Sequence, residues 1–109
     1  MDIGICVPSH VGDIDYIVRA EALGYSHAWL ADSQMIWSDC YAALALAADR
    51  TSRIKLGTGV AITGTRPASV SAAGIATINA SPRAHVFRSW CGQHGHANYG
   101  AAAPAHCSV

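Results

Sequence analysis

The chain has 109 residues, which is the length of one small domain. Its seven Lys and Arg side chains are balanced by seven Asp and Glu, so we expect no broad positive field that would attract nucleic acid or an anionic membrane. No apolar run reaches the roughly 18 residues of a membrane span, and the N-terminus lacks the features of a secretion signal, so the sequence predicts a soluble, cytoplasmic protein.

Strand-like and helix-like segments alternate through the first half of the chain. The segment DIGICVP (2–8) predicts a strand that stops at Pro8, and DIDYIVRAEALG (13–24) predicts a helix that ends at Gly24. SHAWLAD (26–32) predicts the second strand. We expect Ser38 to cap the second helix, DCYAALALAADR (39–50), because its alanines and leucines favour helix strongly.

A third strand and a third helix complete the alternating pattern. RIKLGTGVAI (53–62) predicts the strand, and ASVSAAGIATINA (68–80) predicts the helix, entered through Thr65 and Pro67 with Gly74 as a weak position inside it. Three strand-then-helix units in about 80 residues favour an α/β fold with parallel strands and crossover helices. We therefore expect a structured unit over residues 1–80.

The tail, residues 81–109, has a different composition. It holds four of the six histidines and two of the four cysteines, but no Asp, Glu, Lys, Leu or Ile. Because it shows neither helical nor strand periodicity, it predicts irregular structure. Four of its side chains could supply the ligands of a zinc ion, but their spacing matches no common zinc module, so we expect no metal site there: Cys91, His94, His96 and Cys107.

Two segments resemble a known family. VRAEALGYSHAWLADSQ (18–34) and IKLGTGVAITGTRP (54–67), in this order, are similar to the luciferase-like monooxygenase superfamily and, within it, to the methylenetetrahydromethanopterin reductases that use the deazaflavin coenzyme F-420. The resemblance implies a (β/α)8 TIM barrel, of which this chain would hold about three N-terminal units. The predicted fold class is therefore an incomplete TIM barrel followed by an irregular tail.

The resemblance also implies where the site lies. In such barrels the chemistry is at the carboxyl ends of the strands, and the family pattern places a non-proline cis peptide at Gly59-Val60, behind the cofactor ring. The residues it implies for cofactor binding are Asp32, Ser33, Gly59, Val60, Ala61, Ile62 and Thr63. His10 is the candidate for substrate contact. No catalytic residue is assigned, because Ser33 stands where some deazaflavin enzymes have a histidine.

Two of these candidates have simpler interpretations. Asp32 could be a carboxylate that caps a loop or a helix entry, and His10 could be a solvated loop histidine. Cys6 and Cys40 are interpreted as small buried apolar residues rather than nucleophiles.

The tail does not contain the family's continuation in its own reading frame. Read one base out of frame, however, its degenerate codons permit that continuation, for example G-N-T-A-M-R-T-M from residues 92–99. We therefore hypothesise a one-base slip near codons 79–81, in the gene or in its sequencing.

The implied activity is that of a flavin- or deazaflavin-dependent oxidoreductase, which transfers hydride between coenzyme F-420, preferred here over FMN, and a small organic substrate. The resemblance implies that intact relatives are homo-oligomers. We expect this truncated chain to be inactive by itself, since the contacts that hold the cofactor's phosphate lie in later units. Two alternatives stay open: a small self-contained α/β binding module, and a metal-binding protein acting through the tail.

Overall fold

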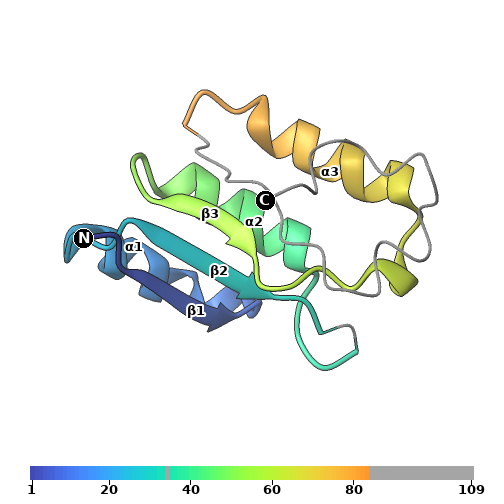
Figure 1. Ribbon diagram of the computed structural model, residues 1–109, viewed down its shortest axis with the longest axis horizontal. Helices are drawn as coiled ribbons and strands as arrows, with labels where there is room; N and C mark the ends of the chain where they lie inside the picture. The colour runs from blue at the N-terminus through green and yellow to red at the C-terminus, as the bar shows by residue number, and fades with distance from the viewer. Residues whose placement is uncertain (34, 84–109) are drawn as a thin grey trace.

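The computed structural model describes residues 1–33 and 35–83 (Figure 1). Strands and helices alternate along this part of the chain, with short 3-10 turns at Val11–Asp13 and Thr63–Thr65. The elements in chain order are β1 (Gly4–Pro8), α1 (Ile14–Ala22), β2 (His27–Ala31), α2 (Cys40–Arg50), β3 (Lys55–Thr58) and α3 (Ala68–Asn79). The three predicted strand-then-helix units are therefore confirmed.

The strands form one parallel sheet in the order β1-β2-β3. Pro8 is in register with Ala31, and Leu30 is in register with Thr58. Since the strands are parallel and in this register, all three finish at the same edge of the sheet. That carboxyl edge is where a barrel of this kind places its chemistry.

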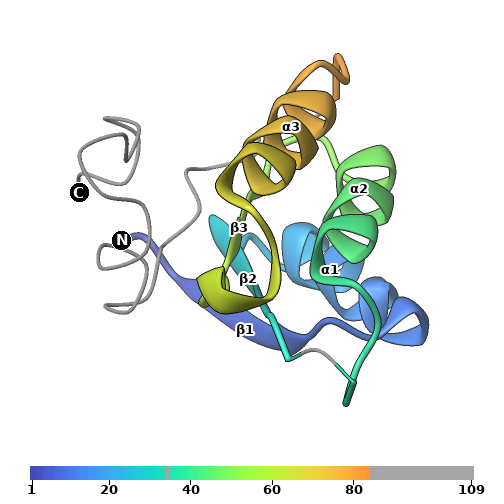
Figure 2. The same ribbon diagram turned by 90° about the vertical axis from the view of Figure 1, so that its right-hand side faces the viewer.

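The helices lie together on one side of the sheet (Figure 2). Helices α1 and α2 bury their apolar side chains against the strands, and α3 packs on α2. A Cβ on Gly74 would lie 3.1 Å from Cδ1 of Tyr41, so the glycine that looked weak in the sequence is where α3 approaches α2 closely. The core residues include Val7, Ile14, Ile17, Leu30, Leu44, Ile54, Leu56 and Ile78.

The opposite face of the sheet carries the ring of Trp29. Gly4 and Gly59, on the two neighbouring chain segments, leave room for it: a Cβ on Gly59 would lie 2.9 Å from Cβ of Trp29. The Trp29 ring is stacked on His27 with centroids 5.5 Å apart and planes 8° apart. In a closed barrel this face would point inward.

Two details of the sequence prediction are wrong. Helix α2 is capped by Asp39, whose Oδ1 accepts a hydrogen bond from the Ala42 N–H at 2.9 Å; Ser38 instead accepts one from the Val11 N–H at 3.3 Å. β3 ends at Thr58 rather than at residue 62. Gly59 is still hydrogen-bonded to Leu30 of β2, whereas the Ile62 N–H donates to the side chain of Asp32.

The predicted end of the first helix is confirmed, and most of the predicted tail lies outside the described residues. Gly24 does end the first helical segment, at a φ of 89° that an L side chain rarely adopts. Of the predicted tail, residues 84–109 lie outside the described residues, and these include the four candidate metal ligands. Among the described residues, none of the helices is long and apolar enough to span a membrane.

Candidate functional site

The exits of β1 and β2 are tied together by Ser9. This residue is fully buried, and its Oγ lies 2.6 Å from the carbonyl oxygen of Ala31 and 3.1 Å from that of Ser38. A buried hydroxyl needs such partners, because an unpaired polar group in the interior is costly. Ser9 thus fixes the first strand exit against the second.

Asp32 joins the exit of β2 to the segment that follows β3. The residue is 5% exposed. Its Oδ2 accepts one hydrogen bond from the Ile62 N–H at 3.0 Å and another from Nη1 of Arg66 at 2.8 Å. We call residues 59–66 the ring loop, after the role that the resemblance implies for it. In this structure Asp32 is a carboxylate that holds the ring loop, in agreement with the simpler interpretation offered above.

Arg66 makes a second ion pair from the same guanidinium. Its Nη2 lies 2.7 Å from Oδ2 of Asp39, and its central carbon lies 4.9 Å from the ring centroid of Tyr41. Burial alone would lower the pKa of Arg66, but the hydrogen bonds and charges of Asp32 and Asp39 outweigh it and raise the pKa. The guanidinium is therefore a permanent positive charge that connects β2, α2 and the ring loop.

The charges of Asp32 and Arg66 also shift the pKa values of Asp39 and Cys40. Burial tends to raise the pKa of Asp39, yet the Ala42 N–H and Arg66 lower it below its ordinary value. For Cys40, burial and the nearby charge of Asp32 raise the pKa to about 12, so its thiol stays protonated near neutral pH. The interpretation of Cys40 as a buried residue is confirmed, whereas it is wrong for Cys6, which is exposed.

The ring loop begins with a cis peptide bond between Gly59 and Val60, as the resemblance implied. The Gly59 N–H still donates to the carbonyl of Leu30, at 2.8 Å. After it, Val60 is 40% exposed and Ile62 is 38% exposed, while Ala61 is buried. The loop therefore presents apolar surface at the carboxyl edge of the sheet.

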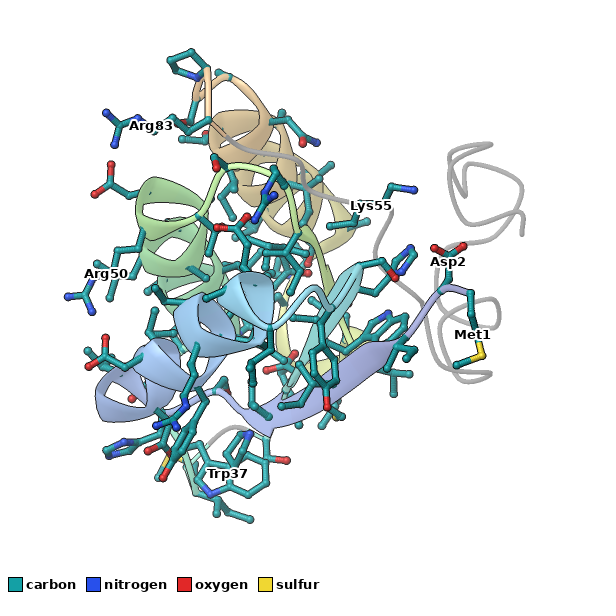
Figure 3. All side chains as sticks on the ribbon, turned by 90° about the vertical axis from the view of Figure 1, so that its left-hand side faces the viewer. Met1, Asp2, Trp37, Arg50, Lys55 and Arg83 are labelled. Carbon is teal, nitrogen blue, oxygen red and sulfur yellow. The ribbon has the colours of Figure 1, made fainter. Side chains whose placement is uncertain are left out.

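The remaining candidates lie around the same edge. The carbonyl of Ser33 accepts hydrogen bonds from the N–H groups of Ile36 and Trp37, at 3.3 and 3.1 Å. Figure 3 shows Trp37 at one end of the molecule, away from Lys55 at the start of β3. Thr63 opens a 3-10 turn; its side chain lies outside the described part.

His10 lies just after β1 and has local partners. Its Nδ1 accepts a hydrogen bond from the Gly12 N–H at 3.2 Å and lies 3.8 Å from Oδ2 of Asp13. The side chain is largely exposed. This geometry fits the solvated loop histidine, and the predicted substrate contact stays a prediction.

The sequence pointed to Ser9 as part of the first strand exit, but Asp39 and Arg66 were not among the candidates. For Arg66 a signal was present: it is the single charged residue between Lys55 and Arg83. An isolated cation at a strand exit needs a carboxylate partner if it is to be buried. Within residues 1–33 and 35–83, no group of three or more His, Cys, Asp and Glu side chains could hold a metal ion.

Comparison with known proteins decides the family. Residues 1–81 match the family model described as luciferase-like monooxygenase. The chain belongs to the luciferase-like monooxygenase family. No curated protein matches it.

A solved structure of a reductase is similar to most of this chain. It is the coenzyme F420 dependent tetrahydromethanopterin reductase from Methanopyrus kandleri, at 31% sequence identity and a TM-score of 0.63. The match covers 71% of this chain but 23% of that chain. The luciferase-like chain thus spans less than a quarter of the reductase's length. The predicted fold class is confirmed: the chain forms about three βα units of an incomplete TIM barrel.

Proposed function

We propose that this chain supplies the cofactor-ring side of a luciferase-like oxidoreductase that transfers hydride between coenzyme F-420, rather than FMN, and a small organic substrate. The observation that carries the proposal is the geometry of the ring loop. A buried carboxylate, Asp32, holds the loop so that Val60 and Ile62 stand exposed at the carboxyl edge of the sheet. The similarity to an F420 dependent reductase supports the choice of cofactor.

The residues present fit a flat, tricyclic ring. Val60 and Ile62 offer an apolar surface on which the flat face of a ring could lie, and Gly59 lets the start of the loop pack against Trp29. Asp32 and Ser33 would lie beside the ring, and His10 would face the substrate. The cofactor supplies the hydride chemistry; this chain positions the ring and excludes water from one side of it.

The isolated chain should not turn over substrate. It spans 23% of the related reductase, and we propose that the groups that hold the rest of the cofactor lie in the part of the barrel that this match does not cover. Within the described residues, β1 and β3 each have one edge without a partner strand, and such edges favour association rather than a finished barrel. We propose that the complete enzyme is a homo-oligomer of full-length chains.

We also propose that residues 81–109 arose from a one-base slip and form no part of the functional unit 1–80. The family match ends at residue 81, which supports this division. Sequencing the coding DNA tests it: the codons in use should spell the family continuation in the shifted frame. Codons that spell any other sequence there would end the idea.

A titration of the 15N-labelled 109-residue chain with F-420, and separately with FMN, tests the proposed cofactor site. We expect amide shifts at Asp32, at Ser33 and along residues 59–63, saturating only at millimolar cofactor, at lower concentration for F-420 than for FMN, and without turnover. Shifts centred on another part of the chain, or none at all, would contradict the site. Micromolar affinity would contradict the proposal that the fragment is an incomplete binder.

Two variants sharpen this titration. Val60→Asp puts a charge where the ring should lie and should abolish the shifts. Val70→Asp changes an apolar side chain of α3 that is 54% exposed and should leave them unchanged. If both variants respond alike, the shifts do not report a ring on the loop.

A further inference from the structure

We propose that Arg66 is a positioning residue, which holds the ring loop in its binding geometry by bridging Asp32 and Asp39. This inference rests on the proposed function. It assigns a role to a side chain that contacts Asp32, Asp39 and the Tyr41 ring and that acts on the loop through the carboxylate of Asp32.

The bridge ties the end of the ring loop to two carboxylates that lie 34 and 27 positions earlier in the chain. Asp32 follows β2, Asp39 caps α2, and Arg66 ends the ring loop; the two ion-pair distances are 2.8 and 2.7 Å. The planar fork of a guanidinium can donate to two carboxylates at once, and the Tyr41 ring lies against it. One side chain therefore sets the distance between the loop and the start of α2.

Charge explains why the loop depends on Arg66. The side chain of Asp32 is 2% exposed, and a buried carboxylate that loses its cationic partner is strongly destabilised. Without Arg66, Asp32 would keep the Ile62 N–H but no charged donor from the ring loop. Opening the loop to water would relieve this cost, and that opening breaks the hydrogen bond between Asp32 and Ile62.

Asp39 fixes the position of Arg66 relative to helix α2. Its Oδ1 is engaged by the first turn of α2 and its Oδ2 by Arg66, so the carboxylate is held by a rigid helix end. Arg66 is thereby anchored on α2, and it in turn anchors Asp32. The exposed side chains of Val60 and Ile62 take their places from this chain of contacts.

The test compares three variants of the 109-residue chain by amide hydrogen exchange and by the F-420 titration. Arg66→Ala removes the bridge. Arg66→Lys keeps the charge but not the fork. Arg50→Ala is the matched control: it removes an arginine that pairs with Asp15 at 3.1 Å on the exposed outer side of α2 (Figure 3).

We expect Arg66→Ala to speed exchange of the Ile62 amide by about tenfold or more, because a buried ion pair is broken. The Leu30 amide in the core should exchange as in Arg50→Ala, and the F-420 shifts at Val60 and Ile62 should disappear in Arg66→Ala alone. Arg66→Lys should exchange faster than the wild type at Ile62, since a single ammonium cannot bridge both carboxylates.

Three results would overturn the inference: unchanged Ile62 exchange in Arg66→Ala, wild-type behaviour of Arg66→Lys, or equal acceleration of the Leu30 and Ile62 amides, which would show general unfolding. If Arg66→Ala cannot be folded, Arg66→Lys carries the test. If the wild-type chain shows no F-420 shifts, the proposed function fails, and Ile62 exchange still decides whether Arg66 holds the loop.

Discussion

Glu21 offers a sharp test of how the βα units are joined. It lies on α1, yet its Oε1 accepts hydrogen bonds from three successive backbone N–H groups before β3: Ser52 and Ile54 at 2.9 Å, and Arg53 between them. Burial tends to raise the pKa of Glu21, but these donors and the charge of Arg53 lower it below the ordinary 4.5. One carboxylate oxygen thus holds the α2–β3 turn onto α1.

The cost of removing the Glu21 carboxylate depends on which of the three N–H groups can form a hydrogen bond with water instead. Ser52 and Arg53 are exposed, so their N–H groups can turn to solvent, but Ile54 is 1% exposed. Hydrogen bonds to a charged group contribute about 1.5–3 kcal/mol each when no water takes over. We therefore expect Glu21→Ala to lower the free energy of unfolding by about 2–3 kcal/mol and Glu21→Gln by about 1 kcal/mol.

Urea unfolding followed by circular dichroism measures these changes, with Asp15→Ala as the control. Asp15 and Arg50 are paired but their side chains are 84% and 49% exposed, so that loss should stay below about 1 kcal/mol. Because the folded pKa of Glu21 lies below its unfolded value, its contribution is present above pH 4.5 and is lost as pH falls through the folded pKa. Equal stabilities of Glu21→Ala and Asp15→Ala at pH 7 would refute the reasoning.

Three further changes test separate parts of the fold by the same unfolding measurement. Leu44→Ala, at a fully buried position, should cost about 2–5 kcal/mol, and a loss below that range would mean that the core is loosely packed. Asp39→Ala removes the cap and one arm of the bridge and should cost at least about 1 kcal/mol more than Asp39→Asn, which can still accept from the first turn. Gly24→Ala should cost about 1–2 kcal/mol because of its positive φ, whereas Gly64→Ala, with open space around it and no positive φ, should be nearly neutral.

Much of the fold follows from local patterns in the sequence. The three strands and three helices appear in the predicted order, and Gly24 ends the first helical segment as expected. These features depend on periodicity and on single-residue backbone preferences, which operate over one or two turns of chain. The resemblance also placed the cis peptide at Gly59-Val60, which the structure has.

The geometry of the candidate site depends on contacts between distant residues, which no local sequence pattern reveals. The sequence pointed to Asp32 at a strand exit, but its pairing with Arg66, 34 positions later, arises only when β2 and β3 lie side by side. The cap of α2 was assigned to Ser38 because serine is a common cap, yet Ser38 is engaged by Val11 of another unit and Asp39 takes the position.

The sequence by itself determined the order of elements and the parallel sheet, because hydrophobic spacing and turn residues act locally, and the family resemblance pointed to the carboxyl edge of that sheet. Only the tertiary structure decided which charges meet there. Asp32, Asp39 and Arg66 come from three different elements, and their distances are set by the register of the strands and the packing of α2, neither of which a stretch of sequence contains.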